Sequence, residues 1–141
     1  WSDTLAELIP EATTRSITLM LENTFNGKES FKLMKDLFRQ FPDLSLLLDV
    51  GHANLNSPSN TTHQYLRFFK KRLKHVHLSD NFGRTEDLHL PLGTGHIPWH
   101  TVLKMIKNAG YEDTFTLEVF SRQRAHLLTS REILRAVWQT L

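Results

Sequence analysis

Four short apolar segments, each followed by an amphipathic one, constrain the fold of this chain more than any other feature. Their β-branched and aliphatic side chains predict strands near residues 17–22, 44–49, 75–79 and 115–119. Strands that alternate with helices are typical of βαβ units, in which helices cover a parallel sheet. The predicted fold class is therefore α/β.

The segments between these strands carry apolar residues at helical spacing. Helices are predicted over residues 30–39, 62–74 and 98–110. A last helix is predicted to begin at Thr129, because the tetrad Thr-Ser-Arg-Glu that starts there has the form of a capping box. Residues 1–13 are expected to be the end of an earlier helix. Since no linker-like stretch interrupts the pattern, residues 1–141 are predicted to form a single domain.

The composition is that of a globular chain and argues against several classes of protein. Apolar residues make up 40% of the 141 residues and charged residues 23%. No apolar run approaches the roughly 18 residues of a membrane helix, so no membrane association is expected. The absence of cysteine excludes disulfides and thiolate metal sites and agrees with a cytoplasmic location. A net charge of +2 is too small a surplus to indicate a nucleic-acid partner by itself.

A side chain that can bind a metal ion stands at the end of each predicted strand. These side chains are Glu22, Asp49, His77 and Glu118. The carboxyl ends of parallel strands lie on one side of a sheet, so groups from distant sequence positions meet there. Three carboxylates and an imidazole suit Mn²⁺, Mg²⁺ or Co²⁺ well, and Zn²⁺ acceptably. We therefore expect one divalent metal ion at this end of the sheet.

Each of the four residues also has a local explanation. Glu22 could cap the next turn, Asp49 could form a turn, and His77 could be a core histidine. Glu118 is harder to explain in this way, because an unpaired carboxylate among apolar strand neighbours is costly. The recurrence of such residues at corresponding positions of successive units favours the metal site.

Further polar residues lie near the same strand ends. His52 follows the second strand closely, and Asp87 and His89 stand two residues apart, on one side of an extended segment. These three are candidates for a second metal ion or for substrate binding. Asp80 could orient an imidazole of the metal site as an outer partner. The irregular segment 81–97 is longer than most connections, which favours a functional loop.

Two other features could shape a pocket at this end of the sheet. The Gly-Thr-Gly at residues 93–95 permits the backbone to approach an anion or the sheet closely, although a plain turn explains it more simply. The aromatic residues Phe25, Phe82 and Trp99 could wall such a pocket or could belong to the core. His75, one step further from its strand end than His77, is expected to be buried.

Five segments together resemble the xylose isomerase-like TIM barrels, a superfamily of sugar and sugar-phosphate isomerases and epimerases that also includes endonuclease IV-type repair enzymes. They read LENT at 21–24, LDVGHA at 48–53, HVHLSDN at 75–81, DLHLPLGTG at 87–95 and TLEV at 116–119. The resemblance runs through all four strand–helix units. It implies the fold of half a (β/α)₈ barrel, with four parallel strands and outer helices.

The resemblance also implies roles for the residues at the strand ends. In the isomerases and epimerases, the positions of Glu22, Asp49, His77 and Glu118 hold one divalent metal ion. In the epimerase branch, the positions of Glu22 and Glu118 also act as the acid/base pair, and that of His52 contacts the substrate. The implied activity is proton transfer next to the carbonyl of a sugar or sugar phosphate, by way of an enediolate.

Two alternatives remain open. The endonuclease branch cleaves abasic DNA with three zinc ions and adds the positions of His52, Asp87 and His89 to its site. Leu88 stands where those enzymes carry a basic residue, which speaks against this branch and against a nucleic-acid partner. The other alternative is a non-catalytic remnant that only binds metal.

The length of the chain bears on completeness. A full (β/α)₈ barrel needs about 250 residues, and four units leave a sheet with two open edges and an exposed inner face that should be apolar. We therefore expect the C-terminal half of a longer parent chain. The exposed face should pair with the N-terminal half of that parent or with a second copy in a homo-oligomer.

Overall fold

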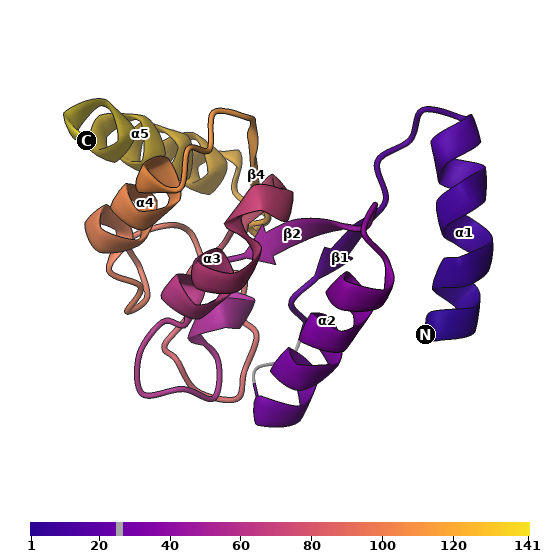
Figure 1. The fold of residues 1–141 in the computed structure, drawn as a ribbon. Coiled ribbons are helices and arrows are strands. Elements are labelled where there is room, and N and C mark those ends of the chain that lie inside the picture. Colours follow the sequence, from indigo (N-terminus) through magenta and orange to yellow (C-terminus); the bar gives the residue numbers. More distant parts are fainter. Residues whose placement is uncertain (25–26) are drawn as a thin grey trace.

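The structure, a computed structural model, describes residues 1–24 and 27–141 and contains one four-stranded parallel sheet with strand order β1-β2-β3-β4 (Figure 1). The strands are β1 (Met20–Glu22), β2 (Ser45–Asp49), β3 (Leu73–Leu78) and β4 (Phe115–Leu117). The helices are α1 (Ser2–Thr14), α2 (Lys28–Gln40), α3 (Thr62–Phe69), α4 (Trp99–Asn108) and α5 (Arg124–Thr140). This arrangement confirms the predicted α/β class with four parallel strands and flanking helices.

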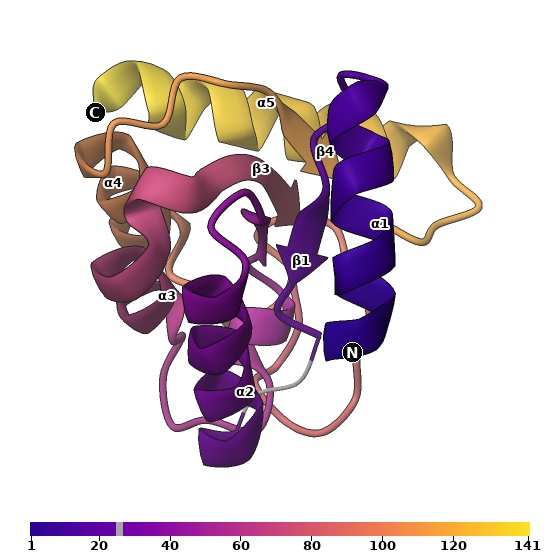
Figure 2. The same ribbon diagram turned by 45° about the vertical axis from the view of Figure 1, so that its right-hand side comes forward.

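The core lies between the central strands and the helices that follow one another around the outside of the sheet (Figures 1 and 2). Side chains of a strand point alternately to its two faces, and outer-face residues of the two central strands are completely buried under the helices. They include Leu46, Leu48, Val76 and Leu78, which join Val102, Leu103 and Ile106 of α4 in one cluster. None of the helices in the described part of the chain has both the length and the hydropathy of a membrane span.

The inner face of the sheet is less apolar than expected. Below the strand ends it presents Met20, Leu47, His75 and Thr116, which are half-buried or exposed. Two of these four side chains are polar, and His75 Nε2 lies 2.7 Å from Thr116 Oγ1. Burial and the nearby His77 lower the pKa of His75. The prediction that His75 is buried was therefore wrong, because its side chain lies on this partly open face.

The boundaries of two helices differ from the prediction. The helix predicted over 62–74 ends at Phe69, and the single 3₁₀ turn η2 (Lys70–Arg72) leads into β3. Leu73 begins the strand because it pairs with Leu46 of β2. The last helix begins at Arg124, five residues before the predicted start at Thr129.

The supposed capping box at 129–132 therefore lies inside α5. Ser130, which is fully buried, donates to the carbonyl oxygen of His126 one turn earlier and accepts a hydrogen bond from the Leu92 amide. A serine inside a helix commonly bonds the carbonyl four residues back, and this one also fastens the long loop. Local sequence could not reveal the partner in that loop, 38 residues away.

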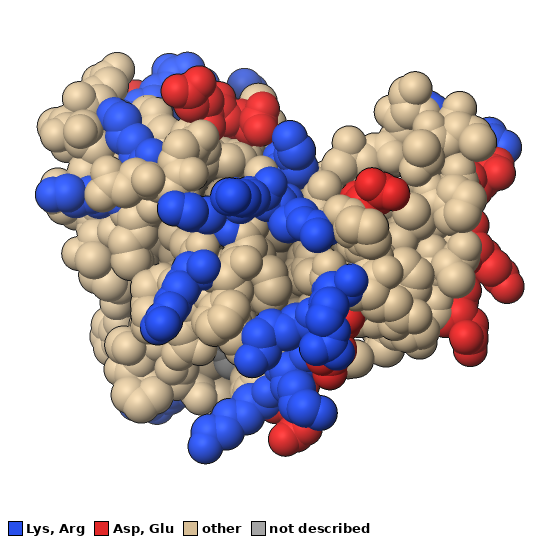
Figure 3. Space-filling view, viewed as in Figure 1, with Lys and Arg blue, Asp and Glu red and all other residues tan. Residues whose placement is uncertain are grey.

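The small net charge hides an uneven surface. Lysine and arginine side chains gather over α2, α3 and the turn η2 (Figure 3), where the exposed basic residues are Lys28, Lys32, Lys35, Arg39, Arg67, Lys70 and Lys71. Helix α1 instead carries the exposed acidic residues Asp3, Glu7 and Glu11. These basic residues lie on the outside of the sheet, on α2, α3 and η2, whereas the candidate ligands lie at the strand ends.

Candidate metal centre

The structure brings Glu22, Asp49, His77 and Glu118 together at the carboxyl ends of the four strands. One ligand atom from each lies within 4.8 Å of those of the others. Nδ1 of His77 is central, at 3.2 Å from Glu118 Oε2, 3.9 Å from Asp49 Oδ2 and 4.0 Å from Glu22 Oε1. Four side chains from four strands thus face one small volume.

The register of the sheet explains why the two outer members are glutamates. Asp49 and His77 are direct partners across β2 and β3. Glu22 pairs with Leu47, two residues below Asp49, and Glu118 follows the last paired residue of β4. Strands of a barrel are staggered in this way, so the outer positions need the longer glutamate side chain to reach the same point.

The two carboxylate oxygens of Asp49 have different surroundings. Oδ1 accepts a hydrogen bond of 2.7 Å from the His52 amide and so forms a turn of the kind expected for an aspartate here. Oδ2 is buried and has no hydrogen-bond partner among the described residues. Burial raises the pKa of Asp49 to about 6, although His52 acts against this rise. A buried carboxylate oxygen in this position fits a cation.

His52 lies between this centre and a second group of polar residues. Its Nδ1 lies 3.3 Å from Glu22 Oε1, and its Nε2 lies 2.9 Å from Asp87 Oδ2. Burial alone would lower the pKa of His52, but its interactions with Glu22, Asp49 and Asp87 raise it to about 9. The same contact with His52 lowers the pKa of Glu22.

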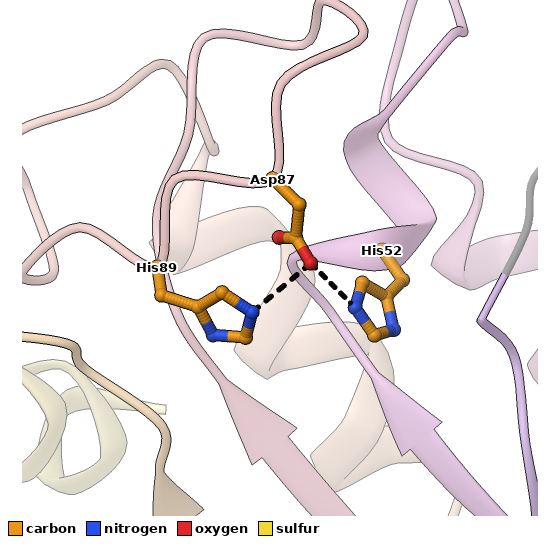
Figure 4. A group of neighbouring side chains, drawn as sticks. All are labelled: His52, Asp87 and His89. Atoms are coloured by element: carbon orange, nitrogen blue, oxygen red, sulfur yellow. Dashed lines mark hydrogen bonds and ion pairs between the residues drawn. The ribbon is translucent and has the colours of Figure 1, made fainter.

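The second group consists of His52, Asp87 and His89, whose ligand atoms also lie within 4.8 Å of one another. Figure 4 shows Asp87 between the two imidazoles, with Oδ2 at 2.9 Å from His52 Nε2 and 3.0 Å from His89 Nε2. The three residues that the sequence pattern grouped together therefore lie close to one another in the structure. Two nitrogens and a shared carboxylate oxygen form a donor set that suits zinc.

His89 is held in place by the end of β4. Its Nδ1 lies 2.9 Å from the carbonyl oxygen of Glu118, and its own carbonyl accepts a hydrogen bond from the Phe120 amide. The ring stacks on Phe120 with the centroids 4.1 Å apart. These contacts offset the cost of its positive φ of 45°, which is uncommon for a residue other than glycine.

Asp80 has a different role from the one expected. Its carboxylate accepts hydrogen bonds from the backbone amides of Asn81, Gly93 and Ile97 and from the Trp99 indole. Asp80 was expected to orient an imidazole. Its hydrogen bonds instead hold both ends of the loop 81–97 in place. Correcting this assignment required the fold, because three of the four donors lie 13 to 19 residues away.

Gly95 allows a close backbone approach, but to the segment just after β3 rather than to a strand of the sheet. A Cβ at this position would lie 2.3 Å from the carbonyl oxygen of Asn81 and 2.3 Å from Asp80 Oδ1. Of the aromatic candidates, Trp99 is buried and Phe82 is exposed, and Phe25 lies outside the described residues. Trp99 therefore belongs to the core.

Buried asparagines support the turn after β2, and sequence reasoning missed them. The side-chain amides of Asn23, Asn60 and Asn81 donate to the carbonyl oxygens of three consecutive residues, 49, 50 and 51. Asn81 Oδ1 also accepts hydrogen bonds from Asn54 Nδ2 and the Gly83 amide. The available signal was the asparagine that directly follows Glu22, but nothing local identified its partner.

A parallel α/β sheet with carboxylates and histidines gathered at the carboxyl ends of its strands defines a protein of the (β/α)-barrel class. Residues 1–137 match the family described as xylose isomerase-like TIM barrel, and the chain belongs to that family.

Three relatives show how much of a barrel this chain represents. It is 29% identical over 140 residues to the uncharacterized protein MJ1311 of Methanocaldococcus jannaschii, a match that covers 94% of this chain and 46% of that protein. A D-tagatose 3-epimerase-like protein is similar in structure, with a TM-score of 0.79, 26% identity and coverage of 98% of this chain and 53% of the other. The TTHB071 protein from Thermus thermophilus, soaked with ZnCl₂, has a TM-score of 0.70, 24% identity and coverage of 95% and 51%. The chain thus spans about half the length of the proteins it matches.

Proposed function

We propose that this chain carries the metal centre and the acid/base pair of a divalent-metal-dependent sugar or sugar-phosphate isomerase or epimerase. The observation that carries the proposal is the convergence of Glu22, Asp49, His77 and Glu118 within 4.8 Å at the ends of four strands. The similarity to a D-tagatose 3-epimerase-like protein supports a sugar as the substrate class.

Three carboxylates and an imidazole would hold one divalent ion, and Mn²⁺, Mg²⁺, Co²⁺ and Zn²⁺ are the candidates. The buried Oδ2 of Asp49, which no described residue bonds, supports this assignment, as does the raised pKa of that carboxyl. A bound ion supplies Lewis-acid polarisation of substrate oxygens, which lowers the barrier to removing a proton from the neighbouring carbon.

Glu22 and Glu118 would move the proton. They stand on β1 and just after β4, the two edge strands, so they can face a substrate from opposite sides. One carboxylate accepts the proton from the carbon next to the carbonyl, and the electron pair of that C–H bond shifts toward the carbonyl oxygen to give an enediolate. The other returns a proton, to the opposite face for epimerisation.

A complete barrel needs four more strand–helix units. Strands β1 and β4 are the edges of the sheet and the inner face is partly open, while the similar structures are about twice as long. We propose that the other half-barrel is the N-terminal part of a longer parent chain or a second copy of this one. Light scattering tests the second case, because pairing with a second copy doubles the mass of the purified chain.

The activity is tested by hydrogen exchange into a panel of ketoses and their phosphates in D₂O, followed by NMR. The expected result is deuterium incorporation next to the carbonyl that depends on added metal and is lost in Glu118→Gln. The assay is made on the assembled barrel, because loops of both halves border such pockets. Stoichiometric metal binding without exchange in any sugar would instead favour the non-catalytic alternative.

The second group favours one further candidate, a zinc-dependent phosphodiesterase that acts on abasic DNA. Its support is the shared position of Asp87 between His52 and His89, which resembles a site for an additional ion. Metal analysis separates the two functions. One ion per chain supports the isomerase or epimerase, whereas several zinc ions together with nicking of abasic duplex DNA would support the nuclease.

A further inference from the structure

Asn23 joins two of the four candidate ligands. It directly follows Glu22, is 1% exposed, and forms two hydrogen bonds with the backbone of Asp49. Its Nδ2 donates to the Asp49 carbonyl oxygen at 2.8 Å, and its Oδ1 accepts from the Asp49 amide at 2.8 Å. One side chain thus satisfies both backbone groups of Asp49 on the side facing β1.

These two hydrogen bonds lie just beyond the last backbone pair between β1 and β2. Pairing between β1 and β2 stops at Glu22 and Leu47, two residues short of Asp49. On the other side, Asp49 pairs directly with His77, and the Val50 amide donates to the His77 carbonyl. Asp49 is therefore fixed to β3 by the sheet itself and to β1 by the amide of Asn23.

We propose that Asn23 is a positioning residue of the metal centre, which sets the separation of Glu22 and Asp49 so that both reach one ion. This inference rests on the proposed function, because it assumes that the four side chains bind a cation. Asn23 itself does not touch the ion. It acts through its hydrogen bonds to the backbone of Asp49 and through its peptide link to Glu22. Residues that position metal ligands in this way alter metal affinity about 10- to 100-fold.

Asn60 offers a matched control. It is 8% exposed, its Nδ2 donates to the Val50 carbonyl at 2.9 Å, and its Oδ1 accepts from the Thr62 amide at 3.0 Å. Asn60→Ala thus loses one donated and one accepted hydrogen bond, as Asn23→Ala does. Neither of the two bonds lost in Asn60→Ala involves a candidate ligand residue.

The experiment is a titration of the purified chain with Co²⁺ alone, followed by visible absorption and by competition with a chromophoric chelator. Asn23→Ala is expected to weaken Co²⁺ binding at least about tenfold and to change the absorption spectrum, since the ligand geometry changes. Asn60→Ala is expected to lower the melting temperature by a similar amount but to change the affinity less than about threefold. Circular dichroism confirms that each variant is folded at the titration temperature.

Asn23→Asp is the second variant, in case the alanine variant does not fold. It keeps the shape and the acceptor oxygen but replaces the N–H donor by a carboxylate oxygen facing the Asp49 carbonyl. Charge alone would tighten cation binding, so weaker binding in this variant supports positioning. Equal losses in Asn23→Ala and Asn60→Ala, or tighter binding in Asn23→Asp, would overturn the role of Asn23 only. Failure of the unaltered chain to bind Co²⁺ would overturn the proposed function as well.

Discussion

Asp49 and His77 are register partners in the β2–β3 pair, and Asp49 Oδ2 lies 3.9 Å from His77 Nδ1. The sheet holds the backbones of both residues, so their side chains are pre-set to face one point without help from a flexible loop. Preorganisation of this kind lowers the cost of assembling a metal site. The two glutamates from the edge of the sheet complete the candidate donor set around this fixed pair.

Asp49→Asn should affect stability in opposite directions without and with metal. Burial raises the pKa of Asp49 from 3.8 to about 6, so ionisation costs the metal-free fold stability progressively as the pH rises through this range. Above pH 6 the uncharged variant should therefore be more stable without metal, by roughly 1–3 kcal/mol. It should gain nothing from metal, whereas the unaltered chain gains about 2.7 kcal/mol at a metal concentration 100 times the Kd.

Thermal unfolding at pH 5 and pH 8, with and without Mn²⁺, measures these changes. Asp36→Asn on the surface of α2 serves as the control. It should change the melting temperature little with or without metal, since exposed ion pairs contribute little to stability. A metal-free Asp49→Asn variant that is less stable than the unaltered chain at pH 8 would contradict the inferred cost of ionising Asp49.

Metal binding should release a proton from His52. The pKa of His52 is raised to about 9 in the metal-free chain, so its ring is protonated at pH 7.5 while Glu22, Asp49 and Asp87 surround it. A cation beside the same carboxylates removes that stabilisation, and about one proton should leave per ion bound. Calorimetry in buffers of different ionisation enthalpy counts the protons. His52→Gln should abolish the release, and His63→Gln, an exposed position on α3, should preserve it.

Gly95→Ala should destabilise the protein far more than Gly110→Ala. The added Cβ at 95 would lie 2.3 Å from the Asn81 carbonyl oxygen and 2.7 Å from its amide, so backbone must move, at a cost of about 3 kcal/mol. At 110 no atom beyond the two neighbouring residues would lie within 4 Å of the Cβ, and only the positive φ of 83° is unfavourable, which costs about 1 kcal/mol. Urea unfolding at constant slope compares the two variants. Similar losses would show that the loop does not press on Asn81.

Asp80→Asn should loosen the loop that carries Asp87 and His89 but leave the first metal centre intact. The carboxylate accepts four hydrogen bonds, and the amide group of asparagine would turn an N–H toward some of these donors. The expected loss is about 2–4 kcal/mol. Zinc titration should then show the binding at the strand ends retained and any further ion lost. Loss of all binding would mean that the loop also supports the first site.

Part of this protein could be inferred from local patterns. The alternation of apolar strands with amphipathic helices indicates a parallel sheet, and metal-competent residues at strand ends must lie on one side of it. The helix that ends before Gly110 follows from local chemistry, since Gly110 adopts a positive φ of 83° just beyond it. The wrong start of α5 shows the limit, because Thr129 and Glu132 have the spacing of a capping box and yet lie inside a helix that begins at Arg124.

The sequence by itself determined the strand–helix order and the residue types at the strand ends, because both are encoded within a few neighbouring residues. Only the tertiary structure decided that Asn23 bonds Asp49, that Asp87 lies between His52 and His89, and that Asp80 fastens the loop. Each of these contacts joins separate segments whose approach depends on strand register and loop closure. Local periodicity carries no information on either, since both arise from packing of the whole chain.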